Sequence, residues 1–300
     1  MKKIILMGEC MVELRRDVNG VIAQSFAGDV YNAGVYLKRT CPTINVQLAS
    51  QVGTDTLSEQ MLVAFADEDI DSSLVLQDPQ RMPGLYWVNT DASGERSFLY
   101  WRESAAARWQ VENYDASYIE KLKQADIFFF SGISIAILQP AHRERFWQVV
   151  RELKESGVKI AFDPNYRPKL WQSVEDTKAQ YDIAFSLSDI ALPGVEDFDM
   201  LYGLSDFDAV ETFLAPYNIN EQVIKDGPNG VVVIENNTRT FISITPVENV
   251  VDTTSAGDSF NGAYLGSRMT GGTIEAAVAS AAKMAGIVIQ HPGAIIPKSV

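Results

Sequence analysis

The feature that most constrains the fold is an alternation of short apolar β-type runs with longer amphipathic helical runs. The β-type runs lie at residues 4–7, 46–52, 126–131, 158–162 and 222–225. Helical patterns separate several of them, at residues 57–66, 143–155 and 174–181. Because neighbouring parallel strands need a crossover connection, this order predicts an α/β fold with a central, mostly parallel sheet flanked by helices. With 300 residues and 46% hydrophobic content, we expect one domain spanning residues 1–300.

An antiparallel pattern interrupts this alternation. Residues 85–90 and 96–100 are β-type and rich in aromatic side chains, and residues 91–95 have the composition of a turn. A hairpin inside an α/β chain predicts a small additional sheet, which we interpret as a lid formed by segments near residues 10–30 and 83–104. A subunit interface is the alternative role, and we expect a homo-oligomer, a dimer or higher.

Composition and charge exclude several classes of partner. The net charge of −14 and the pI near 4.6 argue against nucleic acids and anionic membranes, which require basic surface. No run approaches the ~18 apolar residues of a membrane span. The only cysteines, Cys10 and Cys41, lack metal-ligand spacing, and such scarcity is typical of a reduced, cytoplasmic protein. The chain also has no Gly-x-x-x-x-Gly-Lys-Ser/Thr loop and no Gly-x-Gly-x-x-Gly after a strand, which disfavours P-loop enzymes and NAD dehydrogenases.

Residues 251–263 change from a polar, turn-like segment to a helical one. The small residues Ser255, Ala256 and Gly257 allow a ligand to approach the backbone closely, and amides at the start of a helix favour an anion. Asp258 adds a carboxylate in the first turn, an arrangement suited to phosphoryl transfer. The alternative is a structural acid that only complements the helix dipole, and this stretch alone does not separate the two.

Motifs along nearly the whole chain, taken in order, resemble those of the ribokinase or PfkB family of sugar kinases. The family's C-terminal signature is similar to residues 252–260, Asp-Thr-Thr-Ser-Ala-Gly-Asp-Ser-Phe. Ser255 stands where the family normally has Gly. Glu196 matches the acid of the family's Asn-x-x-Glu motif, but Pro193 replaces the Asn. The other similar motifs lie at residues 27–33, 52–55, 225–230 and 292–294. The resemblance implies a ribokinase-like fold.

The resemblance also implies roles for the matching residues. Asp258 would be the base that takes the proton of the sugar hydroxyl, and we expect it to be ionised at neutral pH because the helix dipole lowers its pKa. The amides of Ser255, Ala256 and Gly257 would form the anion hole for the transferred phosphoryl group. The implied cofactor-binding residues are Lys225, Gly227, Gly230 and Asn165 for ATP, Glu196 for Mg²⁺, and Asp252 and Thr254 for a monovalent cation such as K⁺.

Within this family the chain is most similar to 2-keto-3-deoxygluconate kinases. That similarity implies that Arg102 and Arg167 hold the carboxylate of a sugar acid. The charge agrees, because a strongly acidic protein must concentrate cations to bind an anion, and arginine forks suit carboxylates. The implied substrate-binding residues are Gly28, Asp29, Asn32, Tyr86, Tyr100, Arg102, Arg167 and Asp258.

The expected activity is therefore a 2-dehydro-3-deoxygluconokinase reaction. ATP, with Mg²⁺, would phosphorylate 2-keto-3-deoxygluconate to 2-keto-3-deoxy-6-phosphogluconate, so the expected partners are a sugar acid and ATP. Two alternatives stay open. One is a fructokinase- or ribokinase-like kinase of a neutral sugar, and the other is a non-catalytic sugar sensor on the same fold.

Overall fold

Two sheets organise the structure, a computed structural model that describes residues 1–16, 20–90 and 96–300. Within these residues, nine strands form the large sheet in the order β13-β12-β11-β10-β9-β8-β1-β4-β5, and every pairing from β11 to β5 is parallel. Their bounds are β1 Lys3–Met7, β4 Asn45–Val52, β5 Val75–Gln77, β8 Ile127–Ser131, β9 Lys159–Asp163, β10 Ile190–Ala191, β11 Glu221–Lys225, β12 Val231–Glu235 and β13 Thr238–Ile242. The predicted mostly parallel α/β sheet is confirmed.

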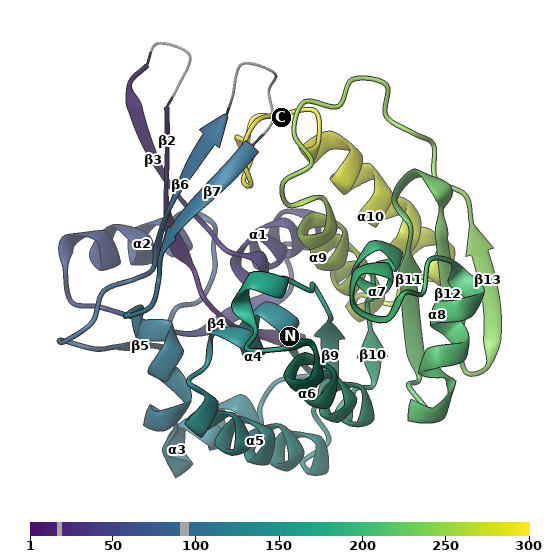
Figure 1. The fold of residues 1–300 in the computed structure, drawn as a ribbon, viewed down its shortest axis with the longest axis horizontal. Helices are drawn as coiled ribbons and strands as arrows, with labels where there is room; N and C mark the ends of the chain where they lie inside the picture. The colour runs from purple at the N-terminus through teal and green to yellow at the C-terminus, as the bar shows by residue number, and fades with distance from the viewer. Residues whose placement is uncertain (17–19, 91–95) are drawn as a thin grey trace.

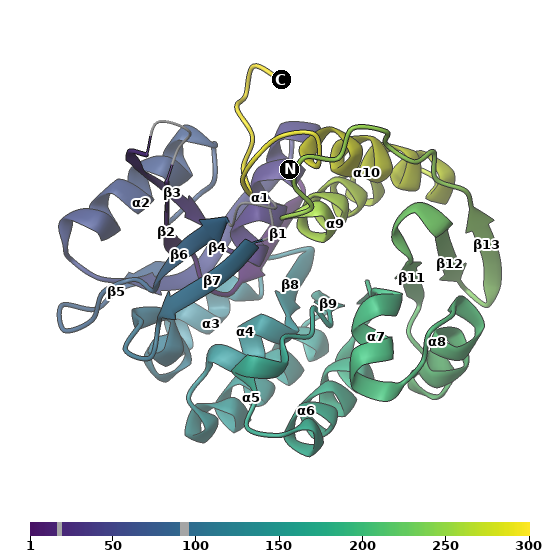
Figure 2. The same cartoon turned by 45° about the horizontal axis from the view of Figure 1, so that its top comes forward.

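Helices cover both faces of this sheet, as Figures 1 and 2 show. One face of β1 and β8 packs with apolar residues of α5 and α6, and the other with those of α1, α9 and α10. Central strands such as β8 are therefore buried at every position, which explains their continuous apolar sequence. The helices are α1 Asp29–Thr40, α2 Thr56–Asp67, α3 Ala116–Leu122, α4 Gly132–Ile137, α5 Arg143–Glu155, α6 Val174–Leu187, α7 Val195–Tyr202, α8 Phe207–Leu214, α9 Ala256–Met269 and α10 Ile274–Val288.

The predicted small sheet is present and projects from the β4 side of the molecule (Figure 1). Four strands of the described chain form it in the order β3-β2-β6-β7. The hairpin of β6 and β7 is antiparallel, with Tyr86 opposite Tyr100, whereas β2 and β6 are parallel. The predicted turn at residues 91–95 lies outside the described residues. The strands are β2 Met11–Arg16, β3 Ile22–Ala27, β6 Leu85–Thr90 and β7 Arg96–Trp101.

The opposite edge of the large sheet is antiparallel, because β11, β12 and β13 follow one another as hairpins. Asn236 and Asn237 have φ angles of 49° and 64°, the left-handed conformation that a tight two-residue hairpin turn requires. In the described part of the chain, no helix has the length and apolarity needed to cross a membrane.

Candidate active site

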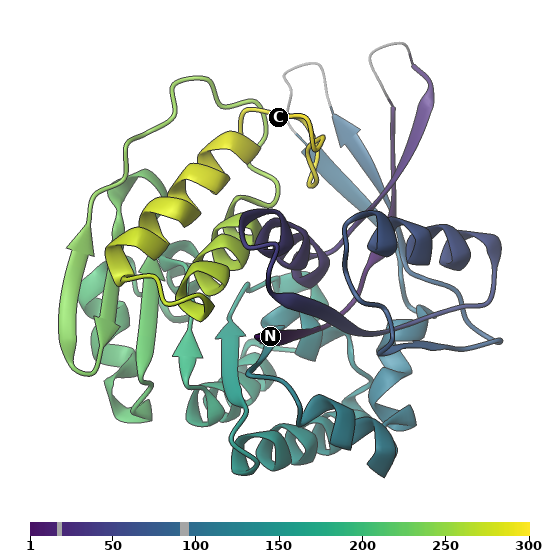
Figure 3. The same cartoon turned by 180° about the vertical axis from the view of Figure 1, so that it is seen from behind.

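The candidate active site lies at the carboxyl edge of the large sheet, where the first turns of α1 and α9 meet the end of β9. Asp29 begins α1, Asp258 lies in the first turn of α9, and Asp163 ends β9. The two helices run side by side (Figure 3). They pack closely, because a Cβ at Gly262 of α9 would lie 2.1 Å from the carbonyl oxygen of Ala33 in α1. This edge is the usual ligand-binding position of a parallel sheet.

Asp258 is oriented by α1. Asn32 donates from Nδ2 to Asp258 Oδ2 at 2.9 Å, and Asn32 Oδ1 accepts from the amide of Gly28 at 3.3 Å. Burial raises the pKa of Asp258 to about 7, the negative charge of Asp29 adds to the rise, and the hydrogen bond from Asn32 opposes it. The expectation that the helix dipole keeps this carboxyl fully ionised at neutral pH is therefore wrong. Desolvation and like charges exceed a first-turn effect of about 0.3–1 kcal/mol.

Asp258 belongs to a group of carboxylates that repel one another, together with Asp29, Asp163 and Asp197. The charge of Asp163 raises the pKa of each of the other three. At Asp197, burial is the largest cause of the rise in pKa, which reaches about 7. Among the described residues, no group of three or more acidic, histidine or cysteine side chains is arranged to hold a metal ion. The donors still fit Mg²⁺, which is usually bound by one or two carboxylates together with substrate phosphates.

Lys225, an expected ATP-binding residue at the end of β11, is joined to this group through Asn261. Lys225 Nζ donates to Asn261 Oδ1 at 2.7 Å, and Asn261 Nδ2 donates to Asp163 Oδ2 at 2.8 Å. Asn261 is buried in α9 and so links the ends of β9 and β11. The sequence prediction omitted Asn261. Its position three residues after Asp258, on the same helix face, is the signal that points to it.

The turn before α9 has the shape of an anion site. Ser255 has a φ of 65°, a conformation suited to Gly, and its buried Oγ has no hydrogen-bond partner among the described residues. The amide of Ala256 donates to Thr253 O at 3.2 Å, so this member of the expected anion hole is already engaged. A Cβ at Gly257 would meet no atom of the described residues within 4 Å, which leaves space beside first-turn amides that lack acceptors inside the helix. A phosphate fits because its oxygens would accept from the Ser255 hydroxyl and these amides.

Asp252 ties this turn to the C-terminal segment. Its Oδ1 accepts from the amide of Thr254 at 3.0 Å, and its Oδ2 accepts from the amide of Gly293 at 2.5 Å. The family-like motifs at residues 252–260 and 292–294 therefore meet in space. A role for Asp252 and Thr254 in binding K⁺ stays a prediction.

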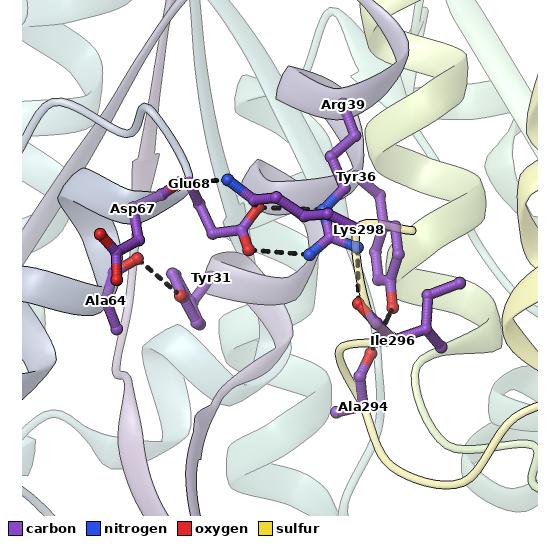
Figure 4. A network of polar contacts seen from close by, with 9 residues as sticks. All are labelled: Tyr31, Tyr36, Arg39, Ala64, Asp67, Glu68, Ala294, Ile296 and Lys298. Atoms are coloured by element: carbon purple, nitrogen blue, oxygen red, sulfur yellow. Dashed lines mark hydrogen bonds and ion pairs between the residues drawn. The ribbon is translucent and has the colours of Figure 1, made fainter. Parts of the chain in front are cut away.

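The C-terminal segment is in turn fixed to α1, as Figure 4 shows. Tyr36 Oη donates to Ala294 O at 2.7 Å, and Arg39 Nη1 donates to Ile296 O at 2.7 Å. Arg39 also forms a two-pronged ion pair with Glu68 at the end of α2, with N–O distances of 2.9 and 2.7 Å. The turn that carries the anion site is thus anchored to the helix that carries Asn32.

The other residues expected to bind ATP lie in two separate places. Gly227 and Gly230 shape the turn between β11 and β12, with φ angles of 49° and 119°. A Cβ at Gly230 would also lie 2.8 Å from the Phe241 ring, so only Gly fits there. Asn165 instead contacts the carboxylates, donating from Nδ2 to Asp29 Oδ2 at 3.2 Å.

Glu196, the expected Mg²⁺ ligand, is exposed in the first turn of α7. The next residue, Asp197, lies in the site: its Oδ1 accepts from the amide of Tyr166 at 3.1 Å and lies 3.6 Å from Arg167 Nη1. Adjacent first-turn acids look alike in a sequence, and only the packing of α7 distinguishes them.

The two arginines expected to bind substrate both have acidic partners. Arg167 pairs with Asp197, and its side chain is 53% exposed. Arg102 is ion-paired with Glu9, and its side chain is 8% exposed. Arg167 is therefore the more accessible cation, and Arg102 is largely buried.

The expected lid tyrosines lie on one face of the small sheet, with ring centroids 5.8 Å apart. Tyr86 is buried, and its hydroxyl donates to Glu13 Oε2 at 2.5 Å. Tyr100 is 51% exposed, and the guanidinium of Arg102 lies 5.8 Å from its ring centroid. Tyr100 is thus the accessible member of the pair.

Comparison with known proteins identifies the family of the chain. The whole chain, residues 1–300, matches the pfkB family of carbohydrate kinases. It is 39% identical to the 2-dehydro-3-deoxygluconokinase of Escherichia coli strain K12, over 99% of this chain and 98% of that protein. It is 40% identical to the enzyme of the same name from Dickeya dadantii, over 99% of this chain and 97% of that enzyme. A PfkB protein from Polaromonas sp. JS666 has a similar crystal structure, with a TM-score of 0.86, 25% identity, and coverage of 97% of this chain and 96% of that one. This chain belongs to the pfkB family of carbohydrate kinases.

Proposed function

We propose that this protein phosphorylates 2-keto-3-deoxygluconate, also called 2-dehydro-3-deoxygluconate, on its terminal hydroxyl. ATP is the phosphoryl donor, Mg²⁺ accompanies it, and the product is 2-keto-3-deoxy-6-phosphogluconate. One observation carries the chemistry. Asp258, in the first turn of α9, accepts a hydrogen bond from Asn32 of α1, and burial raises its pKa to about 7. The substrate is supported by the names of full-length relatives that are 39% and 40% identical to this chain.

In the proposed reaction, Asp258 accepts the proton of the terminal hydroxyl. The hydroxyl oxygen forms a bond to the γ-phosphorus while the bond from that phosphorus to the bridging oxygen of ADP breaks. A carboxylate with a pKa of about 7 is a better proton acceptor near neutral pH than an ordinary one, yet it is ionised in a large fraction of molecules. The Ser255 hydroxyl and the first-turn amides would hold the transferred phosphoryl group.

Mg²⁺ and ATP would both bind beside the group of carboxylates that contains Asp163 and Asp197. Mg²⁺ would neutralise phosphate charge, with Asp163 and Asp197 as the nearest carboxylate candidates, and Lys225 would add a positive charge at the turn after β11. K⁺ at Asp252 and Thr254, and a dimer or higher oligomer that uses the small sheet, belong to the same proposal. In that proposal the small sheet acts as a lid over the sugar.

A neutral sugar is the second candidate substrate, and one observation favours it. Both arginines assigned to the substrate carboxylate already have acidic partners, Glu9 for Arg102 and Asp197 for Arg167. A substrate without a carboxylate would leave both pairs undisturbed. The identity to sugar-acid kinases over the whole chain is the reason to rank this candidate second.

A substrate comparison separates the candidates. ADP release is measured with purified protein, ATP and Mg²⁺, using 2-keto-3-deoxygluconate, fructose or ribose as acceptor. We expect kcat/KM for the sugar acid to exceed that for either neutral sugar by at least about 100-fold, as two charge-assisted hydrogen bonds of about 1.5–3 kcal/mol each allow. Preference for fructose or ribose would overturn the substrate, and sugar binding without turnover would identify a sensor.

A further inference from the structure

A buried ion pair lies at the junction of the two sheets. Arg102 Nη2 contacts Glu9 Oε2, and the side chains of Arg102 and Glu9 are 8% and 2% exposed. The residues are 93 positions apart, and neither belongs to a strand. Glu9 lies between β1 of the large sheet and β2 of the small sheet, and Arg102 directly follows β7.

All four described connections between the sheets meet at this pair. Glu9 is in the first connection and Arg102 is in the last. Gly28 connects β3 to α1, and a Cβ there would lie 2.2 Å from the carbonyl oxygen of Glu9. Gly84 precedes β6, and a Cβ there would lie 2.6 Å from Glu9 Oε1 and 3.2 Å from Arg102 Cβ. The position of the small sheet therefore depends on the packing around Glu9.

The pair leaves two charged groups incompletely hydrogen-bonded. Glu9 Oε1 and Arg102 Nε are buried, and neither has a partner in the described part of the chain. A buried ion pair is weak evidence for stability, because desolvation offsets the attraction. A guanidinium carries five N–H donors, and Glu9 contacts this one through Nη2, so Glu9 alone does not use them all.

The charges of Arg102 and of Arg167, the other arginine proposed to bind the substrate carboxylate, both influence Tyr100. Burial raises the pKa of Tyr100, and the positive charges of Arg102 and Arg167 both oppose that rise. Both guanidinium groups therefore act on the same hydroxyl, although one follows the small sheet and the other follows β9.

We propose that Glu9 is the positioning residue for Arg102. It holds one side of the guanidinium, so that the group is oriented toward the substrate carboxylate, and it fixes the small sheet at the angle that this contact requires. This inference rests on the proposed function, because it assumes a sugar-acid substrate.

A double-mutant cycle tests the inference. Glu9→Gln keeps the shape of the side chain and removes its charge, while Arg102→Gln removes the guanidinium. We expect Glu9→Gln to raise KM for 2-keto-3-deoxygluconate about ten- to hundredfold, the range of a hydrogen bond to a charged group, with KM for ATP within about twofold. Because Glu9 acts through Arg102, the double variant should be no worse than Arg102→Gln alone.

Asp176→Asn is the matched control, because it removes the acid partner of another buried arginine, Arg143. It should leave both KM values unchanged. Gly84→Ala is a second variant that keeps both charges and displaces Glu9 Oε1, and it should raise the sugar-acid KM as well.

Two results would overturn the inference while leaving the proposed function intact. In the first, the native protein uses the sugar acid, but the increases in sugar-acid KM caused by Glu9→Gln and by Arg102→Gln multiply in the double variant. In the second, Glu9→Gln lowers the melting temperature and leaves the sugar-acid KM unchanged. If the native protein does not use the sugar acid, both the inference about Glu9 and the proposed function are overturned. That result needs no variant.

Discussion

Replacing Asp258 with Asn should inactivate the enzyme and stabilise the fold. The substitution keeps the shape of the side chain and an oxygen to accept from Asn32 Nδ2, but it removes the proton acceptor and the charge. General-base catalysis contributes typically about 100- to 10,000-fold, so kcat should fall by that factor. Substrate binding should be retained.

The gain in stability follows from the raised pKa of Asp258. The ordinary pKa of 3.8 applies to the unfolded chain, and the folded protein keeps the proton up to about pH 7. Between these values the folded state binds more protons, so the free energy of unfolding of the native protein falls as pH rises. The slope is about 1.36 kcal/mol per pH unit, which amounts to about 3 kcal/mol between pH 5 and pH 7. The Asp258→Asn variant has no carboxyl proton to lose at this position, so it escapes this loss.

Urea unfolding at pH 5 and pH 8 measures the difference. The advantage of Asp258→Asn over the native protein in free energy of unfolding should be larger at pH 8 by about 3 kcal/mol. Asp199→Asn, which changes an exposed acid on α7, is the control and should show no such pH dependence. An advantage that is equal at both pH values would refute the raised pKa. A kcat within about tenfold of native would refute the role of base.

Other predictions concern the same site. For the native protein, kcat/KM for the sugar acid should rise with pH with an inflection at about 7, measured by ADP release, because Asp258 must be ionised to accept the proton. Arg167→Ala should raise the sugar-acid KM about ten- to hundredfold and leave KM for ATP unchanged. Ser255→Gly should raise the melting temperature by relieving about 1 kcal/mol of left-handed strain, and should raise KM for ATP severalfold by removing the buried hydroxyl. Gly28→Ala should lower the melting temperature, because its Cβ would lie 2.2 Å from Glu9 O.

The large sheet could be predicted from the sequence because its central strands are apolar throughout and their connections are long. The β6–β7 hairpin was equally clear from its two aromatic β-type runs, whereas the pairing of Tyr86 with Tyr100 was not predicted, because a period of two fixes the faces of a strand and not its register. Short helices such as α3 and α8 were not predicted. Each spans about two turns, too few for a periodic pattern to stand out.

The candidate site was harder to predict where a property arises from contacts between distant segments. The first-turn position of Asp258 suggested a low pKa, but Asp29 and Asp163, far away in sequence, share its surroundings and help to raise it. Glu9 resembled a residue that merely ends an apolar run, and its partner Arg102 is 93 positions away. No local pattern records either relationship.

Phosphorus NMR of the reaction product tests the central claim most directly. After incubation of the native protein with ATP, Mg²⁺ and 2-keto-3-deoxygluconate, a new phosphate monoester signal should appear, coupled to the two protons of the terminal carbon, in amounts equal to the ADP formed. The Asp258→Asn variant should give almost none. Absence of this signal with native protein, while fructose or ribose gives its own phosphate ester, would contradict the account.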